Sequence, residues 1–171
     1  MGYRKHVIAA ALAAAAAASP AAAAPASATA GARALLLLPV TMTKVDDLDF
    51  GTVIKSNTSG TVALNASTGA RSFAGGVTGA AAAGHRAVFA GAGTGGQQVI
   101  VVVIPPAQLT NSSGDTIDVL ALTIDNNGNP IRTIDPATRT FFVNVGGILS
   151  IGANQPDGVY SATFQVTANY L

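Results

Sequence analysis

The sequence contains no cysteine and no glutamate, and only 10% of its residues are charged. Without cysteine the protein cannot form a disulfide, so packing must stabilise it. A zinc site is hard to assemble, because the only histidines are His6, close to the N-terminus, and His85. Nine lysines and arginines balance eight aspartates, which leaves no basic surface of the kind that binds nucleic acid.

Sequence motifs for catalysis, nucleotide binding or metal binding are also scarce. His85 is the one candidate base for Ser-His-Asp catalysis, and no nucleophile-elbow motif accompanies it. Gly91–Gly96 has the glycine spacing of a dinucleotide fingerprint, but the strand-like run Val99–Ile104 follows where a helix is required, so we expect a hairpin loop. Asp125–Asn129 resembles a calcium loop, but Pro130 occupies the place that needs glycine, so we expect a turn. We therefore predict no catalytic residues, no cofactor and no metal.

The N-terminal segment, residues 1–30, has the pattern of a secretory signal peptide. Arg4 and Lys5 precede the apolar run Val7–Ala18, and Ala28–Ala30 fits a cleavage site. The run is shorter than the roughly 20 residues that cross a bilayer, so we expect no stable membrane span. We predict an exported protein, and about 141 residues remain after the cut, which is enough for one domain.

Beyond residue 30, strand signals recur and helix signals are nearly absent. Short runs rich in Val, Thr and Ile are separated by Gly, Asn, Asp and Pro, which predicts an all-β antiparallel sandwich. Val99–Ile104 is apolar without alternation and is expected to be buried on both faces, and Gly79–Gly84 is expected to be a loop or single turn. The predicted strands are Leu36–Thr43, Phe50–Ile54, Gly60–Asn65, Arg71–Phe73, Ala87–Ala90, Val99–Ile104, Val119–Ile124, Thr140–Val145, Leu149–Ile151 and Tyr160–Tyr170.

The segment from Tyr160 to Tyr170 alternates between apolar and polar residues. Because side chains alternate across a strand, this pattern predicts one strand with a wholly apolar face. A slip of one residue would bury the polar set, so the register is strongly specified. The apolar positions are Tyr160, Ala162, Phe164, Val166, Ala168 and Tyr170.

A second alternating segment, residues 31–43, follows the predicted cleavage site. It is either the first strand of its own domain or an arm that completes the sheet of a neighbouring molecule by β-augmentation. The sequence leaves both alternatives open. Its apolar positions are Ala32, Ala34, Leu36, Leu38, Val40 and Met42.

Short motifs resemble a bacterial family known only as domain of unknown function 4402. Leu48–Val53 resembles the opening of that family, and Gly146–Leu149 and Gly158–Tyr170 resemble its close. The resemblance covers about the whole chain after the signal peptide. It implies a secreted bacterial protein, and the family is itself similar in pattern to spore-coat-U-type and other chaperone–usher pilin subunits.

The end of the sequence is similar to the end of chaperone–usher pilins. These commonly have a glycine at the fourteenth position from the C-terminus, an alternating apolar strand and a penultimate tyrosine, and Gly158 and Tyr170 occupy those two places. The resemblance implies an immunoglobulin-like antiparallel β-sandwich of pilin type, although the disulfide of many pilins is absent. It also implies a chaperone-docking strand made of Gly158, Tyr160, Ala162, Phe164, Val166, Ala168 and Tyr170.

The same resemblance implies a mode of assembly. The N-terminal segment would be a donor arm that fills a groove in another copy of the chain or in a related subunit. A periplasmic chaperone and an outer-membrane usher are the other implied partners, with passage through the periplasm to the cell surface or the exterior. The donor residues would be Ala34, Leu36, Leu38 and Val40.

These observations favour a non-enzymatic structural subunit of a bacterial surface fibre, assembled by strand complementation. The expected layout is a signal peptide over residues 1–30, an arm or first strand over 31–43 and a β-sandwich over 44–171. One alternative is a monomeric secreted or outer-surface binding domain of unknown ligand. A further alternative is a hydrolase that uses His85 with an aspartate and a serine.

Overall fold

The computed structural model describes residues 25–171 and divides the chain into two units, Met1–Leu35 and Leu36–Leu171. Most of the predicted signal peptide therefore lies outside the described residues. Within the first unit, residues 25–35 form no strand or helix. Among the described residues, no helix is long and apolar enough to cross a membrane.

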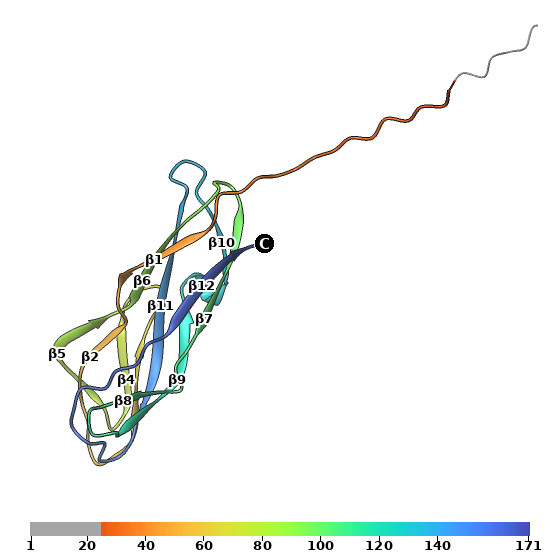
Figure 1. Ribbon diagram of the computed structural model, residues 1–171. Coiled ribbons are helices and arrows are strands. Elements are labelled where there is room, and N and C mark those ends of the chain that lie inside the picture. Colours follow the sequence, from red (N-terminus) through yellow and green to blue (C-terminus); the bar gives the residue numbers. More distant parts are fainter. Residues whose placement is uncertain (1–24) are drawn as a thin grey trace, which may run out of the picture. The chain divides into compact units, whose positions relative to one another are not determined.

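The second unit is all-β, and its one helical element is a single 3₁₀ turn, η1 (Asn126–Gly128) (Figure 1). The described strands are β1 (Thr41–Asp46), β2 (Asp49–Ile54), β3 (Gly60–Leu64), β4 (Arg71–Gly75), β5 (Thr78–His85), β6 (Ala87–Ala92), β7 (Gln98–Ile104), β8 (Gln108–Thr110), β9 (Thr116–Ile124), β10 (Ile131–Thr133), β11 (Thr140–Ile151) and β12 (Gln165–Tyr170).

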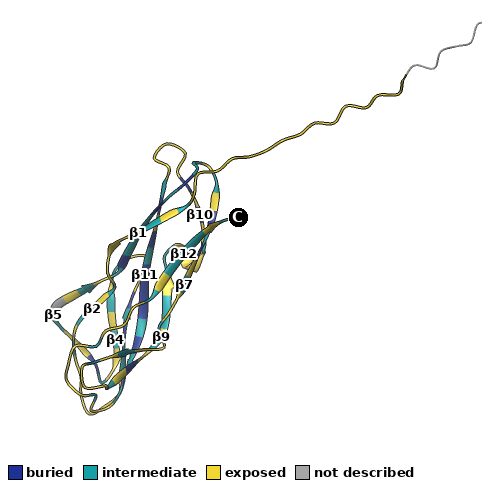
Figure 2. Ribbon diagram, viewed as in Figure 1, coloured by how far each residue is buried: buried dark blue, intermediate teal, exposed yellow. Residues whose placement is uncertain are grey.

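The long strand β11 is the centre of the larger sheet. Its first half pairs with β6, and its second half lies between β3 and β9. β1 pairs with β6, β4 with β3 and β8 with β9, which completes seven strands, all antiparallel. Buried residues recur along β11, which is dark blue over much of its length in Figure 2.

Two smaller antiparallel sheets accompany the first. β7 lies between β10 and β12, and β2 pairs with β5. The chain thus crosses between sheets several times, and β1 and β2 are consecutive strands that pair in different sheets. The result is a β-sandwich-like arrangement of curled antiparallel sheets, as the strand pattern predicts.

The buried side chains form two core clusters. One cluster contains Phe50, Val62, Leu64, Val77, Ile117, Leu149 and Ile151. The other contains Ala87, Val99, Val101, Ile134, Phe141, Val143 and Val145. β11 contributes to both, and the half-buried Leu48 packs against both, so the two clusters meet between β1 and β2.

Three predictions made from local sequence, two about loops and one about burial, are wrong. Gly79–Gly84, expected to be a loop or single turn, lies in β5. The segment has no amphipathic pattern, and its pairing with β2 makes it a strand. Val99–Ile104 is buried on one face only: Val99 and Val101 are buried, whereas Val102 and Ile104 are about half exposed. The loop after β6 is not a hairpin, because β6 and β7 belong to different sheets.

The predicted strands Thr140–Val145 and Leu149–Ile151 are one continuous strand. Gly146 and Gly147 lie between them without ending β11. A Cβ atom on Gly146 would lie 2.1 Å from the carbonyl oxygen of Leu64, and one on Gly147 would lie 2.7 Å from the side chain of Leu122. The glycines therefore allow β3 and β9 to approach β11 closely.

The two alternating segments are shorter strands than predicted. The last strand begins at Gln165, since the preceding residues from Gly158 are irregular apart from one bridge between Ser161 and Thr110. The first strand covers Thr41–Asp46 instead of Leu36–Thr43. Pro39 lacks a backbone N–H and restricts the residue before it, which explains why strand pairing starts only after it.

Candidate functional site

The strand β12 lies at the edge of its sheet. It pairs along its whole length with β7, from Gln165 opposite Ile104 to Tyr170 opposite Val99. Within residues 25–171, no strand pairs with its other edge. Such an edge presents free N–H and C=O groups, which can pair with another strand.

The apolar face of β12 is only partly covered. Val166, Ala168 and Tyr170 pack against the core, and each stays partly exposed. Their partners on the same face of β7 are more enclosed, because Val99 and Val101 are buried. The same sheet face is therefore closed over β7 and open over β12.

A second unpaired edge belongs to β1. This strand ends the larger sheet and pairs only with β6 among the described strands. β1 and β12 come into contact but form no strand pair. Val40 and Met42 pack against the same core cluster as Val166 and Ala168. Two edges with half-buried apolar side chains thus lie near each other, which leaves the sandwich unclosed there.

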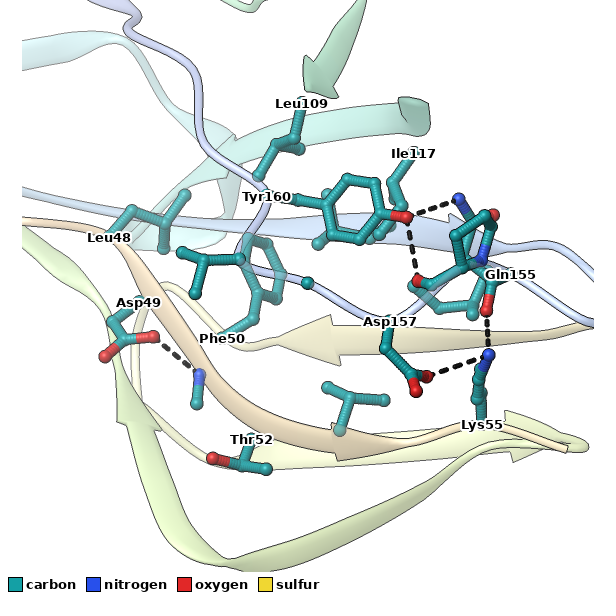
Figure 3. A pocket seen from close by; sticks show the side chains of 17 residues that line it. Leu48, Asp49, Phe50, Thr52, Lys55, Leu109, Ile117, Gln155, Asp157 and Tyr160 are labelled. Carbon is teal, nitrogen blue, oxygen red and sulfur yellow. Dashed lines mark hydrogen bonds and ion pairs between the residues drawn. The ribbon is translucent and has the colours of Figure 1, made fainter. Parts of the chain in front are cut away.

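A cavity of about 500 Å³ lies between β2 and the segment Gln155–Tyr160 that leads toward β12 (Figure 3). Its apolar lining includes Leu48, Phe50, Leu109, Ile117, Leu149 and Ile151. Four of these are core residues, Phe50, Ile117, Leu149 and Ile151. The core is therefore accessible from this cavity, and an apolar side chain is the kind of group that it would accept.

Polar contacts hold the wall of this cavity in place. The Tyr160 hydroxyl donates to the carbonyl oxygen of Pro156 at 2.8 Å and accepts from the Gln155 amide at 3.1 Å. Lys55 bonds the carbonyl oxygen of Gln155 and pairs with Asp157 at 2.9 Å (Figure 3). These bonds fix an irregular segment against β2, so the cavity has a defined mouth.

The predicted docking residues are not all in one strand. Phe164 precedes β12 and packs edge-on against Phe89, with ring centroids 5.9 Å apart. Ala162 is exposed, and Tyr160 lines the cavity. Gly158 also lines the cavity and has φ +152°, a conformation that favours glycine. Sequence reasoning found these residues but missed Lys55 and the β2 side of the cavity, because a core opening has no linear sequence signal.

The predicted donor residues differ in their surroundings. Leu36 is 86% exposed and Leu38 is 52% exposed, and both precede β1 without strand pairing. Val40 packs against the core of its own chain. Ala34 is exposed and lies in the other unit. The four residues therefore do not form one continuous strand in this chain.

His85 lies beside Asp46 at the surface of the protein. Its Nδ1 atom lies 3.7 Å from a carboxylate oxygen of Asp46, and both side chains are about half exposed. No hydrogen bond joins His85 to a serine within the described part of the chain. In the same range, no group of three His, Cys, Asp or Glu side chains is arranged to hold a metal ion.

Residues 40–170 match the family described as Domain of unknown function (DUF4402). The chain belongs to this family. The match begins at Val40, so it includes β1 through β12 and leaves out the exposed leucines before Pro39. Neither a search of curated proteins nor a search of solved structures finds a match.

Proposed function

We propose that this DUF4402 protein is a structural subunit of a bacterial surface fibre, assembled by strand complementation. The observation that carries the proposal is the unpaired edge of β12, with its half-covered apolar face beside a cavity that reaches the core. An added strand at this edge would pair backbone groups and cover apolar side chains at once. We call the region between β1–β2 and the chain from Gln155 to Tyr170 the groove.

The residues before β1 have the properties that such a strand needs. Leu35 and Leu36 are 72% and 86% exposed and are followed by the partly exposed Leu37 and Leu38, so consecutive apolar side chains are available to a partner. Residues 31–37 span roughly 23 Å when extended, and the six residues of β12 span roughly 20 Å. We therefore take residues 31–37 as the donor arm, with Ala34 and Leu36 among the side chains that enter the groove of another copy.

The finer features of the resemblance fit the same proposal. An immunoglobulin-like fold of pilin type lacks one strand between its first and last strands, which would explain why β1 and β12 do not pair with each other. An open groove is an aggregation hazard before assembly, so we propose that a periplasmic chaperone covers it and that an outer-membrane usher then receives the subunit. Export through the periplasm to the cell surface is part of this proposal.

The first test is a pair of charged substitutions in the arm. Ala34→Asp with Leu36→Asp places two charges where the proposal needs buried apolar groups, at a cost of several kcal/mol for each unpaired buried charge. We expect fibres to be lost when the exported protein is examined by electron microscopy. The matched control is Ser112→Asp with Leu120→Asp, which adds the same charge at exposed positions outside the groove.

Fibres that persist in the arm variant would overturn the proposal. An equal loss in both variants would instead point to a general effect of added charge on export or solubility. The amount of exported protein, measured by immunoblot, separates these two results, because the arm variant is expected to be exported and folded but not assembled.

A self-contained surface domain that binds a ligand without polymerising is the second candidate. It is favoured by the pairing of β1 with β6 in the same chain and by the packing of Val40 and Met42 in their own core. An exported protein that stays monomeric at high concentration, with a cooperative thermal transition and a groove that binds no arm peptide, would support this candidate over the first.

A further inference from the structure

Three residues from distant parts of the chain hold the root of the arm. The Tyr170 hydroxyl donates to the carbonyl oxygen of Leu38 at 2.7 Å and accepts from the backbone N–H of Thr94 at 2.7 Å. The backbone N–H of Leu38 in turn donates to the Thr94 hydroxyl at 2.7 Å. We call this set of three hydrogen bonds the clamp.

The clamp is built into close packing. A Cβ atom on Gly93 would lie 2.6 Å from the Tyr170 hydroxyl and 2.8 Å from the side chain of Ile134. Glycine at this position therefore makes room for the hydroxyl. Gly93 is also fixed by its own N–H, which donates to the carbonyl oxygen of Arg139.

The clamp interrupts the chain between the arm and β1. Both backbone polar groups of Leu38 are engaged, and Pro39 has no N–H to offer. Neither residue can therefore take a full part in a strand ladder while the clamp is closed. The apolar alternation that runs from Ala32 to Met42 in the sequence is divided into two parts, an arm before Leu38 and a strand from Thr41.

The clamp also places the arm root over the end of the sandwich. Leu36, Leu37 and Leu38 line a hollow with Thr94, Gly95, Pro136 and Arg139, which belong to the loops after β6 and before β11. To fill its own groove, the arm would have to reverse at Leu38–Pro39 and lie along the unpaired edge of β12. That reversal breaks the clamp.

We infer that the clamp directs the arm to a second copy of the chain and opposes closure on its own groove. The inference rests on the proposed function and assigns Tyr170 and Thr94 a positioning role in it. Tyr170 has two tasks: its ring contributes to the half-covered face of β12, and its hydroxyl holds the arm root. The partner selected is another molecule with the same groove.

The test uses the absence of cysteine, which makes any introduced thiols unique. The exported full chain carries Leu36→Cys in the arm and Ala162→Cys on the exposed segment beside the groove. A short bis-maleimide then joins the two, within one molecule as a cyclised monomer or between molecules as a ladder on a denaturing gel. We expect mainly the ladder in this background.

Tyr170→Phe keeps the ring and removes two of the three hydrogen bonds. At the usual net strength of a hydrogen bond, we expect the ratio of cyclised monomer to ladder to rise by roughly tenfold or more. Thr94→Val should raise the ratio by a smaller factor, and Thr94→Ser, which keeps the hydroxyl, should restore it. Thermal unfolding by circular dichroism separates this effect from a general loss of stability, because the clamp variants are expected to change the ratio more than they change the melting temperature.

Two results would overturn the inference, and they differ. If a ladder forms but the ratio of cyclised monomer to ladder is unchanged in Tyr170→Phe and Thr94→Val, the clamp has no role in directing the arm. The proposed function would still stand. Neither ladder nor cyclised monomer, in any variant, would mean that the arm does not enter a groove, and both the proposed function and this inference would fall.

Discussion

At the scale of single residues, one ion pair shows how a charged group is accommodated in this core. Arg132 is only 9% exposed, and its guanidinium contacts a carboxylate oxygen of Asp125 at 2.6 Å. Arg132 also donates to the carbonyl oxygen of Phe142, and Asn144 donates to Asp125 at 2.7 Å. Buried charges need such partners. The sequence predicts a turn at Asp125 but gives no sign of this network, because its members lie in separate segments of the chain.

Asp135 provides a prediction of pH dependence. Its carboxylate accepts hydrogen bonds from the backbone N–H groups of Thr138 and Ala137, which lower its pKa below the ordinary 3.8. A lowered pKa stabilises the fold above pH about 4, and this contribution is lost as the pH falls through the folded-state pKa. We expect Asp135→Asn to lower stability near pH 6, and the difference from wild type to narrow toward pH about 2.

Urea unfolding at a series of pH values checks this prediction. Asp47→Asn is the control, because Asp47 is an exposed carboxylate whose salt bridge with Lys44 is expected to contribute little. If the stability curves of wild type and Asp135→Asn run parallel from pH 6 to 2, the hydrogen bonds of Asp135 do not contribute as argued.

At the scale of elements, β11 depends on close approach by its neighbours. Gly146 faces the backbone of Leu64 and Ala66, which belong to β3 and the turn after it, so an added methyl group has no flexible side chain to displace. We expect Gly146→Ala to destabilise the protein by about 2–3 kcal/mol or to prevent folding. Chemical denaturation followed by circular dichroism measures the change.

Ser150→Ala on the same strand is the matched control for Gly146→Ala. Ser150 is half-buried, and removing its hydroxyl is expected to change stability by less than about 0.5 kcal/mol. A similar loss in both variants would show that β11 is sensitive to any substitution, which contradicts the specific role given to the glycine.

The elements also show where sequence reasoning succeeds and where it fails. Strands with clear alternation or dense β-branched residues, such as β3 and β7, are predicted close to their observed bounds. β5 is missed, because alanine and glycine give neither alternation nor high strand propensity, and pairing with β2 decides its conformation. Gly146–Gly147 is misread as a break, because a glycine needed for close packing and a glycine in a turn are identical in the sequence.

At the scale of the whole molecule, the proposed strand complementation predicts that an added strand raises the stability of the protein. We expect a peptide of residues 27–38, added to the purified protein that lacks residues 31–37, to bind the groove and raise the melting temperature. A ligand at about 100 times its Kd adds about 2.7 kcal/mol, which corresponds to roughly 8–10 °C for a domain of this size. Differential scanning fluorimetry across a peptide series measures the shift.

The control is the same peptide carrying Ala34→Asp and Leu36→Asp. It keeps the length and the backbone groups but replaces the apolar side chains that the cavity would accept. An equal shift with both peptides would mean that the arm pairs without specific packing. No shift with either peptide would argue against strand complementation and favour a self-contained domain.

The sequence by itself determined the all-β class and the alternating faces of the first and last strands. It also determined the scarcity of residues for catalysis or metal binding, such as cysteine, glutamate and histidine. These follow from local composition and periodicity, which depend only on neighbouring positions along the chain. The family resemblance, now supported by the match over residues 40–170, rests on the same local motifs.

The tertiary structure alone decided which sheet edges stay unpaired and where the first strand begins. β12 is an edge strand because only β7 pairs with it among the described strands. Phe50 and Leu149 are far apart along the chain but share one core cluster, and both line the cavity that opens this core to the surface. Alternation predicts a strand from Leu36 to Thr43, but Pro39 and the hydrogen bonds of Leu38 with Thr94 and Tyr170 keep the residues before Thr41 out of the strand ladder. Contacts between distant residues leave no periodic trace in a sequence, so only the folded chain could show them.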